Sequence, residues 1–180
     1  MRLQAHDLLY LSPELTVLLT AVILSILDLM MPSHKNRKWL GWMALAGVVL
    51  SSAWVLYYMN SLNADLTGPI VLLAQSYRID QFANSFKLIM LIGTALVLLM
   101  SIGTLKKEAV EHRGEYYYLL LPATIGGMIL ASSADLITLF VGLELLSITS
   151  YVLVGIRKKQ LRSNEAAFKY VVLGGIASAF

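Results

Sequence analysis

Residues 135–156 decide the fold, and they read DLITLFVGLELLSITSYVLVGI. From 136 to 156 the stretch is almost wholly apolar, and about 20 such residues form a helix long enough to cross a bilayer. Near the middle of the stretch stands one carboxylate, Glu144. A charge at that depth costs about 2.5–3.5 kcal/mol on insertion scales, so it is retained where it has a function or a partner. The stretch therefore predicts a transmembrane helix that carries a buried acidic site.

The composition of the whole chain is that of a membrane protein. Of its 180 residues, 58% are hydrophobic and 14% are charged, and its mean hydropathy is +0.71. Soluble domains carry about 25% charged residues. The chain has no cysteine, and its histidines (His6, His34 and His112) fall in predicted loops or tails. This excludes disulfides and Cys-ligated iron–sulfur clusters, and no haem held between transmembrane histidines is expected.

The apolar segments predict an all-α, polytopic transmembrane helix bundle that forms a single membrane domain over residues 1–180. Five complete spans are expected at about 11–31, 39–59, 82–103, 116–134 and 136–156. A sixth apolar segment, 166–180, rises only about 22 Å, which is short of the roughly 30 Å hydrocarbon core. We therefore expect a truncated sixth span and an N-terminal piece of a longer protein. The first apolar block is expected to be a retained helix, because no cleavable signal is evident.

Several local signals predict how the spans are connected and packed. Residues 60–81 contain two short strand-like runs around a turn signal, which predict a small surface hairpin. In the fourth span, Gly126 and Gly127 predict close helix packing, and Pro122 near its start predicts a bend. Either Ser133 or Asp135 is expected to cap the helix that carries Glu144.

The basic residues predict the orientation. Ten Lys and Arg residues follow the first, third and fifth spans, whereas Arg2 and Arg78 lie on the other side. The ten are Lys35, Arg37, Lys38, Lys106, Lys107, Arg113, Arg157, Lys158, Lys159 and Arg162. Positive charge marks the cytoplasmic side, so the odd-numbered loops are expected in the cytoplasm and the N-terminus outside.

The sixth segment supplies a candidate partner for Glu144. With a helix start near residue 163, Lys169 lies about 9 Å into that helix. Snorkelling of Lys169 toward the membrane surface is the alternative, since helical side chains lean toward the helix N-terminus. For Glu144 the alternative is a structural carboxylate that is hydrogen-bonded between helices. Ser147 and Tyr151 share its helix face and make that face partly polar.

Three other charged residues fall within predicted spans. Glu14, Asp28 and Lys87 lie near the ends of their spans, so an anchoring or capping role is expected for each. Glu144 is different because it is near mid-depth. A buried carboxylate has a raised pKa unless a cation is near, so proton binding by Glu144 is expected to respond to Lys169.

Two stretches carry a resemblance to a known family. They are FVGLELLSITSYVLVG at 140–155 and NEAAFKYVVLGGIASAF at 164–180. They resemble the antiporter-like subunit N of the proton-translocating NADH–quinone oxidoreductases (complex I). YRIDQFA at 77–83 and LSPE at 11–14 are similar to that family as well. Related antiporter-type subunits often have Trp before the glutamate, and Leu143 in that place favours subunit N.

The resemblance implies a protein of about fourteen helices built from two inverted repeats, with this chain as its N-terminal part. It implies that Glu144 and Lys169 form an ion pair that tunes a lysine further along the chain. The implied function is proton translocation coupled to quinone reduction, as a subunit of an enzyme whose redox site lies outside this chain. NADH, FMN, iron–sulfur clusters and quinone are expected in partner subunits, and no cofactor or metal in this chain.

The expected partners are the other membrane-arm subunits and the lipid bilayer, with no nucleic acid, and the expected location is the bacterial cell membrane. A homologous subunit of a cation/proton antiporter or of a membrane-bound hydrogenase is the first alternative. The second alternative is a membrane scaffold that transports nothing, whose charges only lock helices together. A soluble enzyme is excluded by composition. The sequence also shows no phosphate loop, nucleotide fingerprint or metal cluster, so independent catalysis is not expected.

Overall fold

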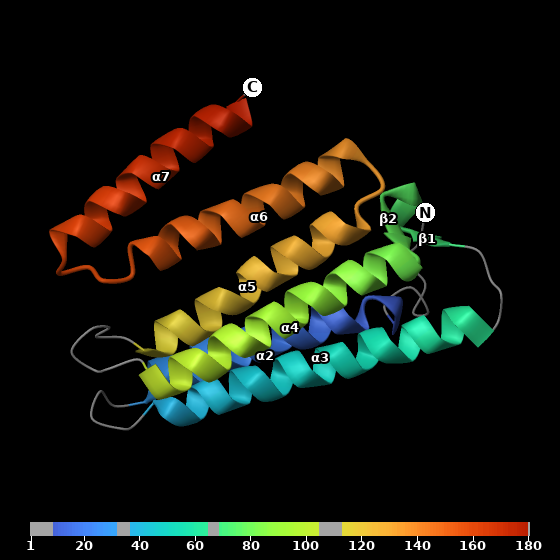
Figure 1. Cartoon of the computed structure of the whole chain (residues 1–180), viewed down its shortest axis with the longest axis horizontal. Coiled ribbons are helices and arrows are strands. Elements are labelled where there is room, and N and C mark those ends of the chain that lie inside the picture. Colours follow the sequence, from blue (N-terminus) through green and yellow to red (C-terminus); the bar gives the residue numbers. More distant parts are fainter. Residues whose placement is uncertain (1–8, 32–36, 65–68, 105–112, 180) are drawn as a thin grey trace.

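A computed structural model describes residues 9–31, 37–64, 69–104 and 113–179. Within these ranges the chain forms six α-helices that alternate in direction along a bundle (Figure 1). They are α2 (Ser12–Met30), α3 (Lys38–Ala64), α4 (Gln81–Thr104), α5 (Arg113–Ser132), α6 (Leu136–Val154) and α7 (Leu161–Ala179). The predicted all-α bundle is confirmed, and each predicted span coincides with one of these helices.

Four of the described helices are long and apolar enough to cross a membrane, namely Ser12–Met30, Lys38–Ser61, Gln81–Thr104 and Leu136–Val154. The chain is therefore a multi-pass membrane protein. α5 runs beside them, antiparallel to its neighbours α4 and α6 (Figure 1), and the exact number of spans stays a prediction. The orientation also stays a prediction, and Lys35, Lys106 and Lys107, which support it, lie outside the described residues.

Two predicted details of the helices were wrong. The sixth helix begins at Leu161 rather than near residue 163, which places Lys169 about 12 Å from its start. Pro122 lies in the middle of α5 because that helix already begins at Arg113. At this position proline removes one backbone hydrogen bond of the helix interior.

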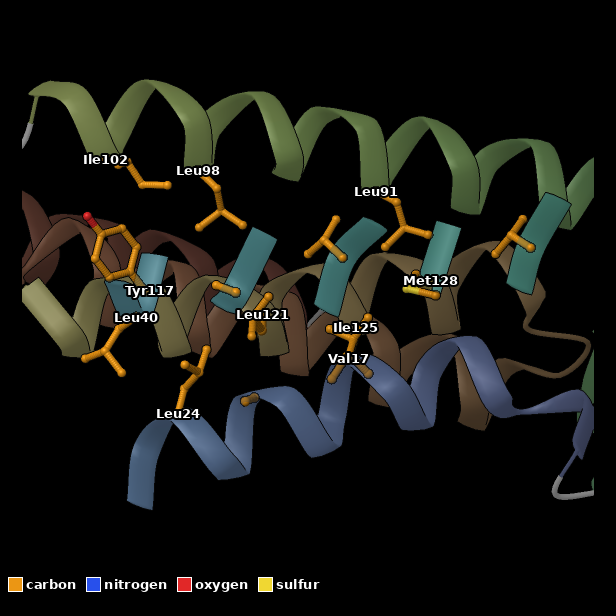
Figure 2. Packing of buried hydrophobic residues seen from close by; sticks show 14 residues of the cluster. Val17, Leu24, Leu40, Leu91, Leu98, Ile102, Tyr117, Leu121, Ile125 and Met128 are labelled. Carbon is orange, nitrogen blue, oxygen red and sulfur yellow. The ribbon is translucent and has the colours of Figure 1, made fainter. Parts of the chain in front are cut away.

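The helices α2, α3, α4 and α5 share one apolar core (Figure 2). Their buried side chains recur every three, four or seven residues, which places them on one face of each helix. The labelled members are Val17, Leu24, Leu40, Leu91, Leu98, Ile102, Tyr117, Leu121, Ile125 and Met128. Lipid tails are as apolar as these side chains, so close van der Waals packing is what holds such a core together.

A close approach of two backbones joins α6 to this core. A Cβ added at Gly126 of α5 would lie 2.6 Å from the backbone nitrogen of Leu146 and 2.9 Å from the carbonyl oxygen of Gly142. Gly127 is different, because a Cβ there would meet only the side chain of Met90, at 3.4 Å. The prediction of close packing is thus confirmed for Gly126, where only glycine lets the helices meet at this distance. α7 packs in turn on α6, on the side away from the core (Figure 1).

A β-hairpin covers one end of the bundle. β1 (Ile70–Leu72) and β2 (Tyr77–Ile79) are antiparallel, with Leu72 opposite Tyr77, so the hairpin predicted within 60–81 is confirmed. Its turn, residues 73–75, has φ values of 52°, 57° and 74° although none of the three is glycine. This backbone region is disfavoured for residues with a Cβ, by roughly 1–2 kcal/mol each. The turn is therefore strained.

The hairpin also holds the turn between α5 and α6. The carbonyl oxygen of Ser76 accepts a hydrogen bond from the backbone N–H of Ala134 at 2.9 Å. The next residue, Asp135, caps α6 because its Oδ1 accepts from the backbone N–H of Thr138 at 2.6 Å. Of the two predicted caps, Asp135 is thus confirmed, whereas the Ser133 hydroxyl donates to a carbonyl of α5 instead.

Candidate functional site

Glu144 is the ninth of the 19 residues of α6 and is partly buried. The capped start of α6 and its run of apolar residues place the carboxylate in the middle of an otherwise apolar helix. Gly142 faces α5, and a residue two positions later points roughly away from that contact. Tyr151 is seven residues after Glu144, which is two turns, so both side chains lie on one face of α6.

That face of α6 packs against α7. The rings of Tyr151 and Tyr170 meet edge to face, with their centroids 4.7 Å apart and their planes at 85°. A Cβ at Gly174 would overlap the hydroxyl of Tyr151, so the tyrosine crosses α7 at a position without a side chain. The register of the two antiparallel helices is therefore set by Tyr151.

The register keeps Lys169 away from Glu144. Lys169 neighbours Tyr170 and so lies level with Tyr151, whereas Glu144 lies about 10 Å further along α6. The Lys169 ammonium instead lies 2.6 Å from Oε1 of Glu165, and both side chains are largely exposed. Among the described residues, the ion pair of Lys169 is thus a surface pair within α7. The roles of Glu144 and Lys169 in proton transfer stay predictions.

A cavity of about 390 Å³ leads toward this face from the opposite end of the bundle to the hairpin. It lies between α5, α6 and α7, and Tyr151 forms part of its wall together with Gly155. Lys158 and Glu115 also line it, and their charged groups are 3.2 Å apart. The cavity is therefore partly polar, with charged groups at its outer end and a tyrosine further in. Apolar packing between helices does not require such a polar lining.

A second charged group is buried deeper than the predicted one. The ammonium of Lys87 in α4 lies 2.8 Å from Oε1 of Glu14 in α2, and the Lys87 side chain is only 1% exposed. The hydroxyl of Tyr77 in β2 donates to the same carboxylate oxygen at 2.6 Å. Lys87 also lies over the ring of Tyr77, 4.9 Å from its centroid. The Glu14 cluster is the name used below for Glu14, Tyr77 and Lys87.

The predicted anchoring roles of Glu14 and Lys87 were therefore wrong. Lys87 does not extend to the membrane surface, because a partner of opposite charge is within reach inside the bundle. A signal was present in the sequence: α2 and α4 start at the same end of the bundle, and the opposite charges are their third and seventh residues. Asp28 is at the other end of α2, where its Oδ1 lies 3.2 Å from Nε of Arg37.

Tyr77 stands outside the membrane-spanning helices, and its surroundings raise its pKa well above the ordinary value of 10.0. Burial is the main cause, followed by the negative charge of Glu14, because both disfavour the phenolate. Tyr77 therefore keeps its proton at physiological pH and acts as a hydrogen-bond donor to Glu14. Within the described residues no group of acidic and histidine side chains is arranged to hold a metal ion.

Several known proteins are similar to this chain in sequence, and one solved structure is similar in the arrangement of its helices. Residues 133–180 match a family model described as NADH:quinone oxidoreductase/Mrp antiporter, TM. NADH-quinone oxidoreductase subunit N from Paenibacillus sp. (strain JDR-2) is 52% identical over 97% of this chain, and its counterpart from Brevibacillus brevis is 51% identical over 97%. Over nearly its whole length the chain is similar in sequence to these subunit N proteins. A solved respiratory complex I from Thermus thermophilus superimposes with a TM-score of 0.71 and 26% identity over 93% of this chain.

The chain corresponds to about a third of the length of these subunit N relatives. It spans 36% of the Paenibacillus protein, 34% of the Brevibacillus protein and 34% of the matching Thermus chain. The part of the chain that matches the family model begins at residue 133 and thus includes both Glu144 and Lys169. The likeness to subunit N extends well before that point, since it also covers the helices that hold Glu14 and Lys87.

Proposed function

We propose that this chain forms part of a proton-translocating membrane subunit of an NADH–quinone oxidoreductase, and that Glu144 binds and releases a proton in it. The observation that carries the proposal is a single carboxylate at the midpoint of an apolar, membrane-length helix. A carboxylate that is half removed from water changes its proton affinity when nearby charge or water changes. Such groups are expected at proton paths because their placement is otherwise unfavourable.

The cavity between α5, α6 and α7 supports a route for the proton. It begins beside Lys158 and Glu115 and reaches Tyr151, which shares the face of Glu144. Tyrosine hydroxyls and water can pass a proton along hydrogen bonds. By the basic-residue count this end of the bundle is expected on the cytoplasmic side, so Glu144 would be loaded from there.

We propose that Lys169 tunes Glu144 through space rather than by contact. At an effective dielectric of about 20, opposite charges about 10 Å apart attract by about 1.7 kcal/mol, against about 4 kcal/mol at 4 Å. A shift of α7 that brought Lys169 nearer would therefore favour the ionised form of Glu144, and its return would favour proton uptake.

The energy for such a shift would come from redox chemistry in other subunits. We propose that NADH, FMN, iron–sulfur clusters and quinone are bound by partner subunits of the complex. We further propose that the chain contacts other membrane-arm subunits and the lipid of a bacterial cell membrane. The names of the bacterial relatives and of the Thermus structure support this assignment.

A cation/proton antiporter subunit is the second candidate function. The description of the matching family model names an Mrp antiporter beside the oxidoreductase, whereas the relatives reported above are named as oxidoreductase subunits.

The variant Glu144→Gln in the full-length gene distinguishes the oxidoreductase function from the antiporter function. Loss of NADH-driven proton uptake by membrane vesicles, with sodium tolerance of the cells unchanged, supports the oxidoreductase. Loss of sodium tolerance alone supports the antiporter. Arg78→Gln, which removes an exposed charge on the hairpin, is the control and is expected to change neither.

A further inference from the structure

The Glu14 cluster contains polar atoms that the protein itself leaves without partners. Oε1 of Glu14 binds both Lys87 and Tyr77, but its Oε2 is buried and has no hydrogen-bond partner. Nδ2 of Asn84 is likewise buried without a partner, and the buried Oγ of Ser132 lies beside the hydroxyl of Tyr77. Buried polar atoms are normally satisfied, so the two unpartnered atoms of Glu14 and Asn84 in one region indicate a bound species.

These three atoms lie around the same ion pair. Asn84 precedes Lys87 by three residues on α4, which places both side chains on one face of that helix. The Ser132 hydroxyl lies next to that of Tyr77, which itself donates to Glu14. Because the described helices already cover these atoms, a bulky ligand has no access, whereas a water molecule needs only two to four polar partners.

We propose that the Glu14 cluster, with Asn84 and Ser132, is a water-holding site that exchanges protons at the hairpin end of the bundle, separate from Glu144. Its ligand is water in the form of H2O or H3O⁺. The inference rests on the proposed function, because it gives the proton a site at the other end of the same bundle. By the basic-residue count, this end is expected to face outside.

The chemistry assigns each member a role. A hydronium ion gives its proton to Oε2 of Glu14, the carboxylate becomes a carboxylic acid, and H2O remains; release is the reverse. Oε2 accepts the proton because Oε1 is already occupied by Lys87 and Tyr77. The titratable groups that face Glu14 are Lys87 of α4, Tyr77 of β2 and Tyr58 of α3. The ammonium of Lys87 lies 2.8 Å from Oε1 and attracts the ionised carboxylate.

A purely structural ion pair makes a different prediction. Replacing both members of a buried pair by apolar residues of similar size is often neutral or stabilising, whereas removing one member is strongly destabilising. Apolar packing can therefore replace an ion pair that only holds helices together, but it cannot replace a carboxylate that binds a proton. The double variant Glu14→Met with Lys87→Met separates the two roles because it keeps the volume and removes the titratable carboxylate.

The test uses the full-length subunit in its native membranes. Inside-out vesicles are prepared from wild type, from Glu14→Gln and from the double variant. The control is Arg78→Gln with Asp80→Asn, which removes a partly exposed ion pair of 2.6 Å beside the same hairpin and keeps an oxygen at residue 80 to cap α4. The readouts are assembled complex by immunoblot of a native gel, NADH oxidation, proton uptake per NADH oxidised, and infrared difference spectra of carboxyl protonation.

We expect the double variant to assemble like wild type, but to take up less than half as many protons per NADH. Its spectrum should lose one carboxylic acid band that the control retains, and Glu14→Gln should lose the same band. A double variant that assembles, pumps and gives the band like wild type overturns the inference. Glu144→Gln is measured alongside: if that variant pumps normally, the proposed function fails, whatever the Glu14 variants do.

Discussion

The ammonium of Lys87 and the carboxylate of Glu14 form an ion pair of 2.8 Å inside the helix bundle. The pair joins α2 to α4, and Tyr77 ties the hairpin to the same carboxylate oxygen. From the hairpin, hydrogen bonds continue to the turn before α6, the helix that carries Glu144. The buried pair and the predicted proton site are therefore connected by one continuous set of contacts.

Tyr77→Phe should destabilise the bundle while keeping its packing. The substitution removes one hydrogen bond to a charged group, worth about 1.5–3 kcal/mol, and leaves the ring over Lys87 in place. Thermal unfolding of the purified full-length protein in detergent should show a lower midpoint. Tyr170→Phe, at a ring that packs on Tyr151, is the matched control and should unfold like wild type. Equal midpoints for both variants would show that the Tyr77 hydroxyl is not held by Glu14.

Gly126→Ala should separate α5 from α6. A methyl group at this position would lie 2.6 Å from a backbone nitrogen of α6, and a backbone atom cannot rotate away. Overpacking of this kind costs about 1–3 kcal/mol. Gly127→Ala, one residue later, meets only the flexible side chain of Met90 at 3.4 Å and should be tolerated. Thermal unfolding of both variants tests this, and a Gly126→Ala protein no less stable than Gly127→Ala would contradict the observed helix contact.

Asp135 should stabilise the start of α6 only while it is ionised. Hydrogen bonds from Thr138, with one from Ser76, lower the pKa of this partly exposed carboxyl below its ordinary value of 3.8. A group with a lowered folded-state pKa stabilises above its unfolded-state pKa, and the stabilisation is lost as the pH falls through the lowered value. The protection of the Thr138 amide against hydrogen exchange should therefore be full at neutral pH and decrease below about pH 4.

The substitution Asp135→Ala should reduce that protection already at neutral pH, because it removes the accepting oxygen. Asp135→Asn keeps an oxygen at the cap and should preserve most of the protection at neutral pH, without the loss in acid. If Asp135→Ala protected Thr138 as well as wild type does, the cap would not hold the first turn of α6.

Much of the fold follows from local sequence signals. The apolar segments predict the helices, the Glu144 segment matches α6, and the strand-like runs within 60–81 form the hairpin. These features depend on a few neighbouring residues, which is why they can be read from one sequence. The close contact at Gly126 was predictable for the same reason, since small residues in a membrane helix indicate packing.

The pairing of charges between helices was only partly predictable, because the positions of Glu14 and Lys87 along their helices are local but the arrangement of those helices is not. A single sequence gives only the distance of Glu14 and Lys87 from a span end, but their ion pair depends on α2 and α4 facing each other across the shared core at matching depths. The distance between Glu144 and Lys169 likewise depends on the register that Tyr151 sets against α7. Register between helices is a property of packing, and hydropathy along one chain does not contain it.

The most direct measurement is proton uptake per NADH oxidised in inside-out vesicles that carry the full-length subunit with Glu144→Gln. Assembled complex is measured in the same membranes, and Glu144→Asp serves as the variant that keeps a titratable carboxylate. The account predicts normal assembly, strongly reduced proton uptake for Glu144→Gln, and at least partial recovery for Glu144→Asp. Normal assembly together with wild-type proton uptake in Glu144→Gln would contradict the central role of Glu144.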